Sequence, residues 1–285
     1  MTAPPPAPPP APPPAPPPVD REALRALAAA VASEAAALLL DGLDDVRASV
    51  ETKSTHTDVV TEMDRRSEHL VVERLLAARP DDGVQGEEGA DRTGSSGVRW
   101  VIDPLDGTTN YLYRFPGFGV SVAAQVEIGG GWRSVAGAVV DVVHGACYTA
   151  SLGGGATCND VEITVSGARD LSRSLVATGF SYEPDRRRRQ AGVLTEVLPA
   201  VRDIRRMGAA AVDLCMVACG RVDAFYEKGL APWDHAAGVL VATEAGALAG
   251  DLDGGPAGTG FVLAATPALF EPLRGLLAAA GARAA

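Results

Sequence analysis

The chain has 285 residues, of which 47% are hydrophobic, enough to bury one large core or two small ones. Its formal net charge of −11 argues against a protein that binds nucleic acid through its general electrostatic field. The four cysteines, at positions 147, 158, 215 and 219, form neither a zinc pattern nor a disulfide framework. We find no signal peptide and no uninterrupted apolar run of about 18 residues, so we expect a cytoplasmic protein without a membrane span.

The first 18 residues hold 12 of the 21 prolines in a repeating Pro-Pro-Pro-Ala pattern. Such a sequence favours an extended polyproline II conformation and cannot pack a core. We interpret residues 1–18 as a solvated tail, and docking to an aromatic groove on a partner is the alternative.

Two amphipathic helices are predicted after the tail. Asp20 is expected to cap the first helix, and Gly42 is expected to end it. The second is predicted from about residue 58 to residue 78, with Asp64 in its early turns, where a negative charge suits the helix dipole. A short strand at 84–85 then places Glu87 on a loop.

The stretch Trp100-Val-Ile-Asp-Pro-Leu-Asp-Gly-Thr-Thr-Asn110 combines a strand, two carboxylates and a turn. Its apolar start predicts a short buried strand, which Pro104 should end just after Asp103 because proline lacks an amide donor. Asp103 and Asp106 would then lie on the exit loop, close enough for one divalent cation to contact both. Gly107 permits a tight turn, and the two threonines after it can cap a helix whose free amides face an anion. Metal ligands beside an anion site indicate phosphate chemistry.

The remaining pattern passes from consecutive strands to strands that alternate with helices. Strands are predicted at 119–128, 134–142, 145–151, 174–178, 202–207, 224–227 and 261–265, and helices at 185–198, 209–219, 232–245 and after Pro267. This order indicates a layered α/β (α+β) protein with two subdomains, at 19–152 and 153–285. The basic run Arg186 to Arg189 is interpreted as a solvated helix face without a function.

Five acidic residues stand at the ends of predicted elements rather than on solvated helix faces: Asp64, Glu87, Asp103, Asp106 and Asp234. Oxygen ligands without His or Cys favour Mg²⁺ or Mn²⁺. Carboxylates that converge on one site would repel one another unless cations neutralised them. Two cations about 3.5–4 Å apart can clamp a phosphate, lower the pKa of a water and stabilise the leaving alkoxide.

These motifs resemble the inositol monophosphatase family. The matching segments, which span about residues 20 to 280 in the family's order, are Lys53 with Asp58-Val-Val-Thr-Glu-Met-Asp64, Gly86-Glu-Glu88, Trp100 to Asn110, and Trp233-Asp234 with Glu244-Ala-Gly246. The resemblance implies an αβαβα sandwich of the inositol monophosphatase and fructose-1,6-bisphosphatase type. It also implies a Mg²⁺-dependent, lithium-sensitive phosphatase that forms a homodimer.

The resemblance also implies the metal ligands. Glu87, Asp103 and the Leu105 carbonyl would bind a first Mg²⁺, and Asp103, Asp106 and Asp234 a second.

A third, weaker metal would lie near Asp64 and Glu87. Thr108 and Asp64 would orient and deprotonate the attacking water, and the Gly107 and Thr108 amides would bind phosphate oxygens. Lys53 would help to close the site, and a solvated loop lysine without a function is the alternative.

For the alcohol part, the resemblance implies contacts from the backbone of Gly208 and Ala210 and from the Glu227 carboxylate, with Asp106 and Asp234 also in reach. A carboxylate suits a polyol because hydroxyl groups donate hydrogen bonds. An imidazole or amine would suit it too.

We therefore expect hydrolysis of a small phosphorylated polyol. Myo-inositol monophosphate is the leading substrate, histidinol phosphate is the nearest alternative, and fructose bisphosphate and 3′-phosphoadenosine phosphate are less favoured. Some bacterial members of this family are RNA-associated regulatory partners. A second hypothesis is therefore that this chain is an interaction protein and not mainly an enzyme. The complete carboxylate set argues against loss of catalysis, and the acidic charge argues against direct contact with nucleic acid.

Overall fold

The structure is a computed structural model and describes residues 19–44, 50–52 and 59–285. The predicted tail and Lys53 lie outside the described residues.

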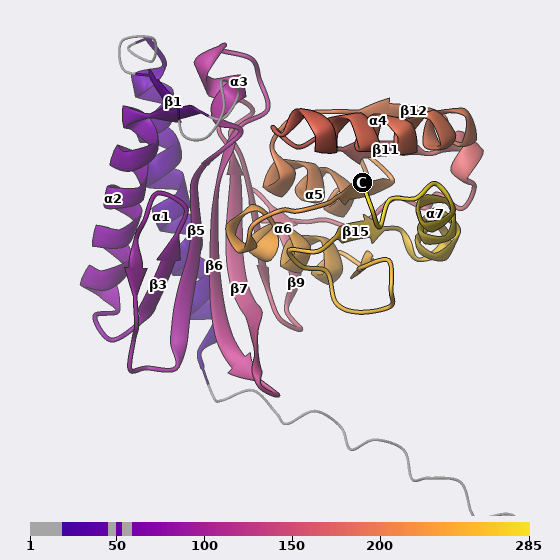
Figure 1. Ribbon diagram of the computed structural model, residues 1–285. Coiled ribbons are helices and arrows are strands. Elements are labelled where there is room, and N and C mark those ends of the chain that lie inside the picture. The colour runs from indigo at the N-terminus through magenta and orange to yellow at the C-terminus, as the bar shows by residue number, and fades with distance from the viewer. Residues whose placement is uncertain (1–18, 45–49, 53–58) are drawn as a thin grey trace, which may run out of the picture.

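Helices and sheets alternate in five layers, as Figure 1 shows. The outer helices α1 (Arg21–Asp41) and α2 (Glu62–Ala78) cover one face of an eight-stranded sheet. The helices α5 (Ala210–Ala218) and α6 (Pro232–Glu244) lie between this sheet and a five-stranded one. The last layer contains α4 (Pro184–Val197) and α7 (Pro267–Ala279). The predicted αβαβα sandwich is confirmed.

The eight-stranded sheet has the order β10-β9-β8-β7-β6-β5-β3-β4. Its strands are β3 (Gly83–Gly86), β4 (Asp91–Arg92), β5 (Val98–Asp106), β6 (Gly119–Ile128), β7 (Gly131–Asp141), β8 (Ala146–Ser151), β9 (Gly155–Cys158) and β10 (Val161–Glu162). Trp100 and Ile102 of β5 pack toward α1 and α2, whereas Val101 packs toward α5 and α6. Both faces of β5 are therefore buried, which explains its unbroken apolar sequence.

The five-stranded sheet has the order β12-β11-β13-β15-β14. Its strands are β11 (Leu175–Thr178), β12 (Asp203–Arg205), β13 (Ala224–Glu227), β14 (Leu248–Gly250) and β15 (Val262–Ala265). The short elements are η1 (Gly42–Asp44), the β1–β2 pair (Val50–Thr52 and Val59–Thr61), α3 (Thr108–Leu112), η3 (Leu171–Arg173) and η4 (Leu198–Ala200). The predicted boundary at residue 152 stays a prediction, and the first sheet itself continues to β10.

Helix α1 begins and ends as predicted. The Asp20 carboxylate accepts a hydrogen bond from the Ala23 amide, and Gly42 is the C-cap. Among the helices in the described ranges, α1 alone has the length and hydropathy of a membrane span. Its apolar side, which includes Leu24, Val31 and Leu39, packs into the core, and a core helix passes the same test of length and composition.

Three local predictions were wrong. The second helix starts at Glu62, because residues 59–61 form β2 instead. Strand β5 does not stop at Asp103 but continues to Asp106, and the register with β6 shifts between these two residues. Pro104 is tolerated because it lies in this bulge, where no ladder amide is needed. The helix α3 is capped by Gly107, whose φ of 91° is left-handed, rather than by a threonine side chain.

Candidate active site

One cavity of about 300 Å³ gathers most of the predicted site residues from both halves of the chain. Ten of them line it: Glu87, Asp103, Leu105, Asp106, Gly107, Thr108, Gly208, Ala210, Glu227 and Asp234. Its volume lies at the lower end of the range for small-molecule sites. Asp64 is buried just outside this lining and is near enough to Asp103 to act on its pKa.

The bulge in β5 places the two central carboxylates. Asp103 is buried, and its Oδ1 accepts the Leu105 amide at 3.0 Å, so the chain turns around its own side chain. Glu87 follows β3, the parallel neighbour of β5, and its amide donates to the Ile102 carbonyl at 3.3 Å. Parallel pairing therefore carries the Glu87 loop to the same sheet end as Asp103.

Asp106 joins the first sheet to the helix layer behind it. Its two carboxylate oxygens accept the Ala210 amide at 3.2 Å and the Ala211 amide at 2.7 Å, at the start of α5. A carboxylate at this end also complements the helix dipole. The Ala210 amide therefore already has an acceptor, and the predicted contact of the Ala210 backbone with the alcohol stays a prediction.

Two residues of α2 support the acidic loops. The Ser67 hydroxyl donates to the Pro104 carbonyl at 2.8 Å, inside the β5 bulge. The buried Glu68 carboxylate accepts the amides of Glu88 at 2.8 Å and Ala90 at 2.9 Å, on either side of the turn that follows Glu87. Glu68 was missed in the sequence, where it looks like one more polar helix residue, because its partners lie twenty residues away.

Gly107 and Thr108 form the turn between β5 and α3. A Cβ at Gly107 would lie 2.9 Å from the Gly117 carbonyl oxygen and 3.1 Å from that of Gly208, so only glycine fits. The Thr108 hydroxyl donates to the Leu105 carbonyl at 3.1 Å. This bond ties the predicted water-orienting hydroxyl to the predicted carbonyl ligand.

The second half of the chain adds two carboxylates to the cavity: Glu227, at the end of β13, and Asp234, in the first turn of α6. The Asp234 Oδ2 accepts the Ala231 amide at 2.6 Å, which closes the start of α6. The remaining motif residue, Glu244, accepts the amides of Gly153 and Gly155 at 3.0 Å each, and therefore has a structural role.

The acidic groups of the cavity are close enough together to raise one another's pKa. Burial, followed by Glu87, Asp106, Asp234 and Asp64, raises the pKa of Asp103 well above its ordinary value. Burial and Asp234 likewise raise the pKa of Asp106, against the opposing effect of the Ala211 hydrogen bond. Such a group of carboxylates is unfavourable as anions unless a cation joins it.

The donor set fits Mg²⁺, since it consists of carboxylate and carbonyl oxygens. Within the described ranges, no three His, Cys, Asp or Glu side chains already surround one ion position. Carboxylates that repel one another do not close on a single point until a cation is present, and the mutual effects on their pKa values place these groups near one another.

Several residues of the cavity wall were not predicted. Phe180, Tyr182, Arg206, Leu230 and Trp233 line it together with the glycines at 179 and 229. Arg206 was visible in the Ile204-Arg-Arg-Met-Gly208 stretch, but nothing in the local pattern directs its side chain into the cleft. The Asn110 side chain supports this wall: its amide donates to the Gly117 and Met207 carbonyls at 2.5 and 2.7 Å.

Comparison with known proteins identifies the family. The model of the inositol monophosphatase family matches residues 20–283. An inositol-1-monophosphatase of Mycobacterium leprae is 44% identical over 274 residues, which cover 89% of this chain and 93% of that protein. A protein named Nus factor SuhB from Pasteurella multocida is 39% identical and covers 81% of this chain and 85% of its own.

A solved structure gives the same result. The extragenic suppressor protein suhB of Bartonella henselae superposes with a TM-score of 0.84 at 34% identity, over 90% of this chain and 98% of that one. The chain therefore belongs to the inositol monophosphatase family and is a phosphomonoesterase.

Proposed function

We propose that the protein hydrolyses myo-inositol monophosphate to myo-inositol and phosphate with the help of Mg²⁺. The observation that carries this proposal is a single cavity that contains both a cluster of buried carboxylates and the Glu227 carboxylate. The carboxylate cluster suits a metal and a phosphate, and Glu227 can accept hydrogen bonds from a polyol.

Glu87, Asp103, the Leu105 carbonyl, Asp106 and Asp234 would hold two Mg²⁺, and Asp64 with Glu87 a weaker third; Mn²⁺ suits the same oxygen donors. When bound, such cations supply charge that stabilises the phosphate and the leaving oxygen. The family resemblance further supports inhibition by lithium.

The chain's own groups would prepare the reaction. The Thr108 hydroxyl and the Asp64 carboxylate would orient the attacking water and take its proton, while the Gly107 and Thr108 amides donate to phosphate oxygens. Lys53, proposed to help close the site, lies outside the described residues.

In the same cavity, Glu227 would accept hydrogen bonds from the alcohol, with the Gly208 backbone and Asp106 and Asp234 beside it. Burial raises the pKa of Glu227 to about 7, so its ionised, accepting form becomes dominant only at or above neutral pH. We expect alcohol binding to strengthen as the pH rises toward this value.

The substrate is tested by a panel of phosphate esters assayed with Mg²⁺. We expect a kcat/KM for myo-inositol 1-phosphate at least tenfold above that for histidinol phosphate or 4-nitrophenyl phosphate, with roughly 1.4 kcal/mol of discrimination from polyol contacts. Preference for histidinol phosphate would establish the alternative, in which Glu227 pairs with an amine. Equal rates on all esters would remove the substrate proposal but not the phosphomonoesterase activity.

A second role, as an RNA-associated regulatory partner, is favoured by one observation, the name Nus factor SuhB borne by a relative 39% identical to this chain. The net charge of −11 favours a protein partner over direct contact with nucleic acid. An inactive variant separates the two roles, as argued in the Discussion.

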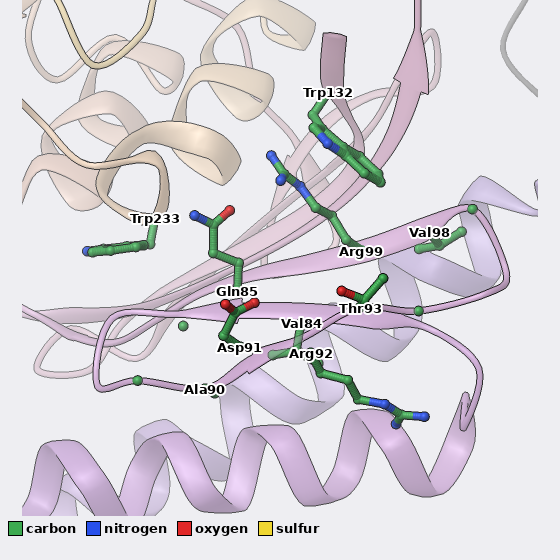
Figure 2. A pocket seen from close by; sticks show the side chains of 15 residues that line it. Val84, Gln85, Ala90, Asp91, Arg92, Thr93, Val98, Arg99, Trp132 and Trp233 are labelled. Carbon is green, nitrogen blue, oxygen red and sulfur yellow. The ribbon is translucent and has the colours of Figure 1, made fainter. Parts of the chain in front are cut away.

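We also propose that the protein is a cytoplasmic homodimer. Next to the catalytic cavity is a second, larger hollow of about 460 Å³ on the sheet face that α6 leaves open, between Trp132 and Trp233 (Figure 2). Trp132 is 42% exposed, and the Arg99 guanidinium stacks on its ring at 4.2 Å. The Gln85 side chain lies between these groups, and its buried Oε1 has no partner in the described structure. Aromatic and arginine side chains of this kind are enriched in protein interfaces.

Replacing Trp132 by glutamate should shift the protein from dimer to monomer in light scattering after gel filtration, because an ionised side chain would be buried at the contact. Trp132→Phe is the matched control and should stay dimeric. A dimer that persists in Trp132→Glu would place the contact on another face.

A further inference from the structure

Two arginines lie beside Glu227, the residue proposed to bind the alcohol. Arg206 lines the cavity and comes from the segment after β12. Arg186 comes from the first turn of α4, inside the basic run that the sequence had suggested was a solvated face. Both are close enough to Glu227 to act on its carboxylate, lowering its pKa against the larger, opposite effect of burial.

Three wall glycines make room for these three charged groups. A Cβ at Gly179 would collide with the Glu227 carboxylate, one at Gly208 with the Arg206 guanidinium, and one at Gly229 with the Arg186 guanidinium. All three glycines line the cavity. Gly208 and Gly229 also have positive φ values of 92° and 81°, which side chains rarely adopt. The wall is therefore shaped around the charged groups.

Neither arginine is neutralised by an ion pair. Among the residues that the structure describes, no carboxylate lies within the 4.0 Å of a salt bridge from Arg186 or Arg206, and neither guanidinium makes a hydrogen bond. By contrast, Arg188 in the same run pairs with Asp185 at 2.6 Å, and Arg205 pairs with Asp203 at 2.7 Å. Among the described residues, the five N–H donors of Arg206 thus remain without a protein acceptor in the cleft, and those of Arg186 remain so beside Gly229.

The neighbouring charges leave the region around Glu227 positive. Lys228 adds a third cation, which is close enough to Arg186 and Arg189 for their repulsion to lower its pKa, after the larger effect of burial. Of the acidic groups that face Arg206, burial raises the pKa of Asp213 well above its ordinary value, so its neutral form is favoured. Asp234 also acts on Glu227, and raises its pKa.

We propose that Arg206, with Arg186 behind Gly229, forms a subsite for a second anionic group on the alcohol part of the substrate, a phosphate or a carboxylate. The inference rests on the proposed phosphatase function and extends its substrates beyond inositol monophosphate, to phosphomonoesters that carry a further negative charge on the alcohol part. An uncharged polyol would use Glu227 but leave the guanidinium groups without a partner. A planar guanidinium binds phosphate and carboxylate through two parallel hydrogen bonds.

The test compares substrates that differ in one anionic group. Fructose 1,6-bisphosphate is paired with fructose 1-phosphate, and 6-phosphogluconate with glucose 6-phosphate, and kcat/KM is measured by phosphate release with Mg²⁺. We expect the wild type to prefer the doubly anionic member of at least one pair. A preference in the fructose pair indicates that the subsite binds a phosphate, and a preference in the gluconate pair indicates that it binds a carboxylate. Arg206→Ala should lower that preference roughly tenfold or more, the loss expected for one charge-assisted hydrogen-bonded contact.

Controls separate binding from general damage. Arg187→Ala removes an exposed arginine one position along α4 and should keep the wild-type preference. Arg206→Lys keeps the charge but not the bidentate geometry, and it should keep part of the preference that Arg206→Ala loses. Arg186→Ala should have a smaller effect than Arg206→Ala, because Arg186 lies behind the wall. A wild type without preference in either pair, or an Arg206→Ala variant with an unchanged ratio, would overturn the subsite. Loss of activity on every ester would instead count against the proposed function.

Discussion

Asp103→Asn is expected to lower kcat with inositol 1-phosphate by a factor on the order of a thousand, about 4 kcal/mol of transition-state stabilisation. The reason is that Asp103 lies among the other carboxylates: after burial, Glu87, Asp106, Asp234 and Asp64 all raise its pKa. A cation held by this group would lose a shared ligand. Asparagine keeps the local fold, since its side-chain oxygen can still accept the Leu105 amide.

Asp103 is a better target than Asp106 for this experiment. The Asp106 carboxylate accepts the two amides of Ala210 and Ala211, so an asparagine there would direct its own amide at a donor and disturb α5. The matched control is Asp81→Asn, which removes one charge from an exposed turn and should leave kcat unchanged. Turnover within tenfold of the wild type in Asp103→Asn would remove Asp103 from the metal site.

The same variant has a second readout, its stability without metal. A carboxyl group whose pKa is raised in the folded state costs no stability below its ordinary pKa of 3.8, and destabilises the folded state as the pH rises through the raised value. In EDTA, Asp103→Asn should therefore melt at a higher temperature than the wild type at pH 8, and the difference should shrink toward pH 4. Mg²⁺ should raise the melting temperature of the wild type more than that of the variant.

Asp103→Asn also separates the two proposed roles. If the cellular function is hydrolysis, the phenotype of a deletion should return in cells that carry only the inactive variant. A phenotype fully rescued by an inactive but folded protein would make partner binding the principal role.

The sequence predicted the site where its signals are local. The spacing of Asp103 and Asp106 and the Gly-Thr-Thr that follows occupy one short stretch, and the cavity contains them all. The order of the longer strands and of the helices was also readable, because the central strands of both sheets are buried on two faces and are apolar runs. The short strands β4, β9, β10 and β14 were not predicted.

Features that depend on distant partners could not be predicted. Pro104 looked like a strand end, but the pairing of β5 with β6 resumes beyond it at Asp106 and Gly119. Glu68 is one of many polar residues on α2, and only the folded chain shows that it holds the Glu88 loop. Arg186 was indistinguishable from its three neighbours, because its contact with Gly229 depends on how α4 packs against the second sheet.

Thr108→Ala is expected to lower kcat roughly a hundredfold while KM changes little, which is the loss of a group that acts on the attacking water. The fold should survive, since α3 is capped by Gly107 without a side-chain hydrogen bond, and Thr108 is only partly buried. Thr109→Ala changes the next residue of the same cavity and is the matched control, with near-normal kcat expected. Thr108→Ser keeps the hydroxyl and should restore most of the rate.

The concentration of Mg²⁺ needed for half-maximal activity decides how Thr108 acts. Its hydroxyl donates to the Leu105 carbonyl at 3.1 Å, so removing it could also release a predicted metal ligand. If the hydroxyl mainly orients the attacking water, kcat falls at saturating Mg²⁺, and the half-maximal Mg²⁺ concentration stays within about threefold of the wild-type value. If the hydroxyl mainly holds the Leu105 carbonyl in position, the half-maximal Mg²⁺ concentration rises more than tenfold, and high Mg²⁺ restores the rate. The bond to Leu105 lies within the β5 bulge region, so we expect the backbone alone to hold the carbonyl and the first outcome to be observed.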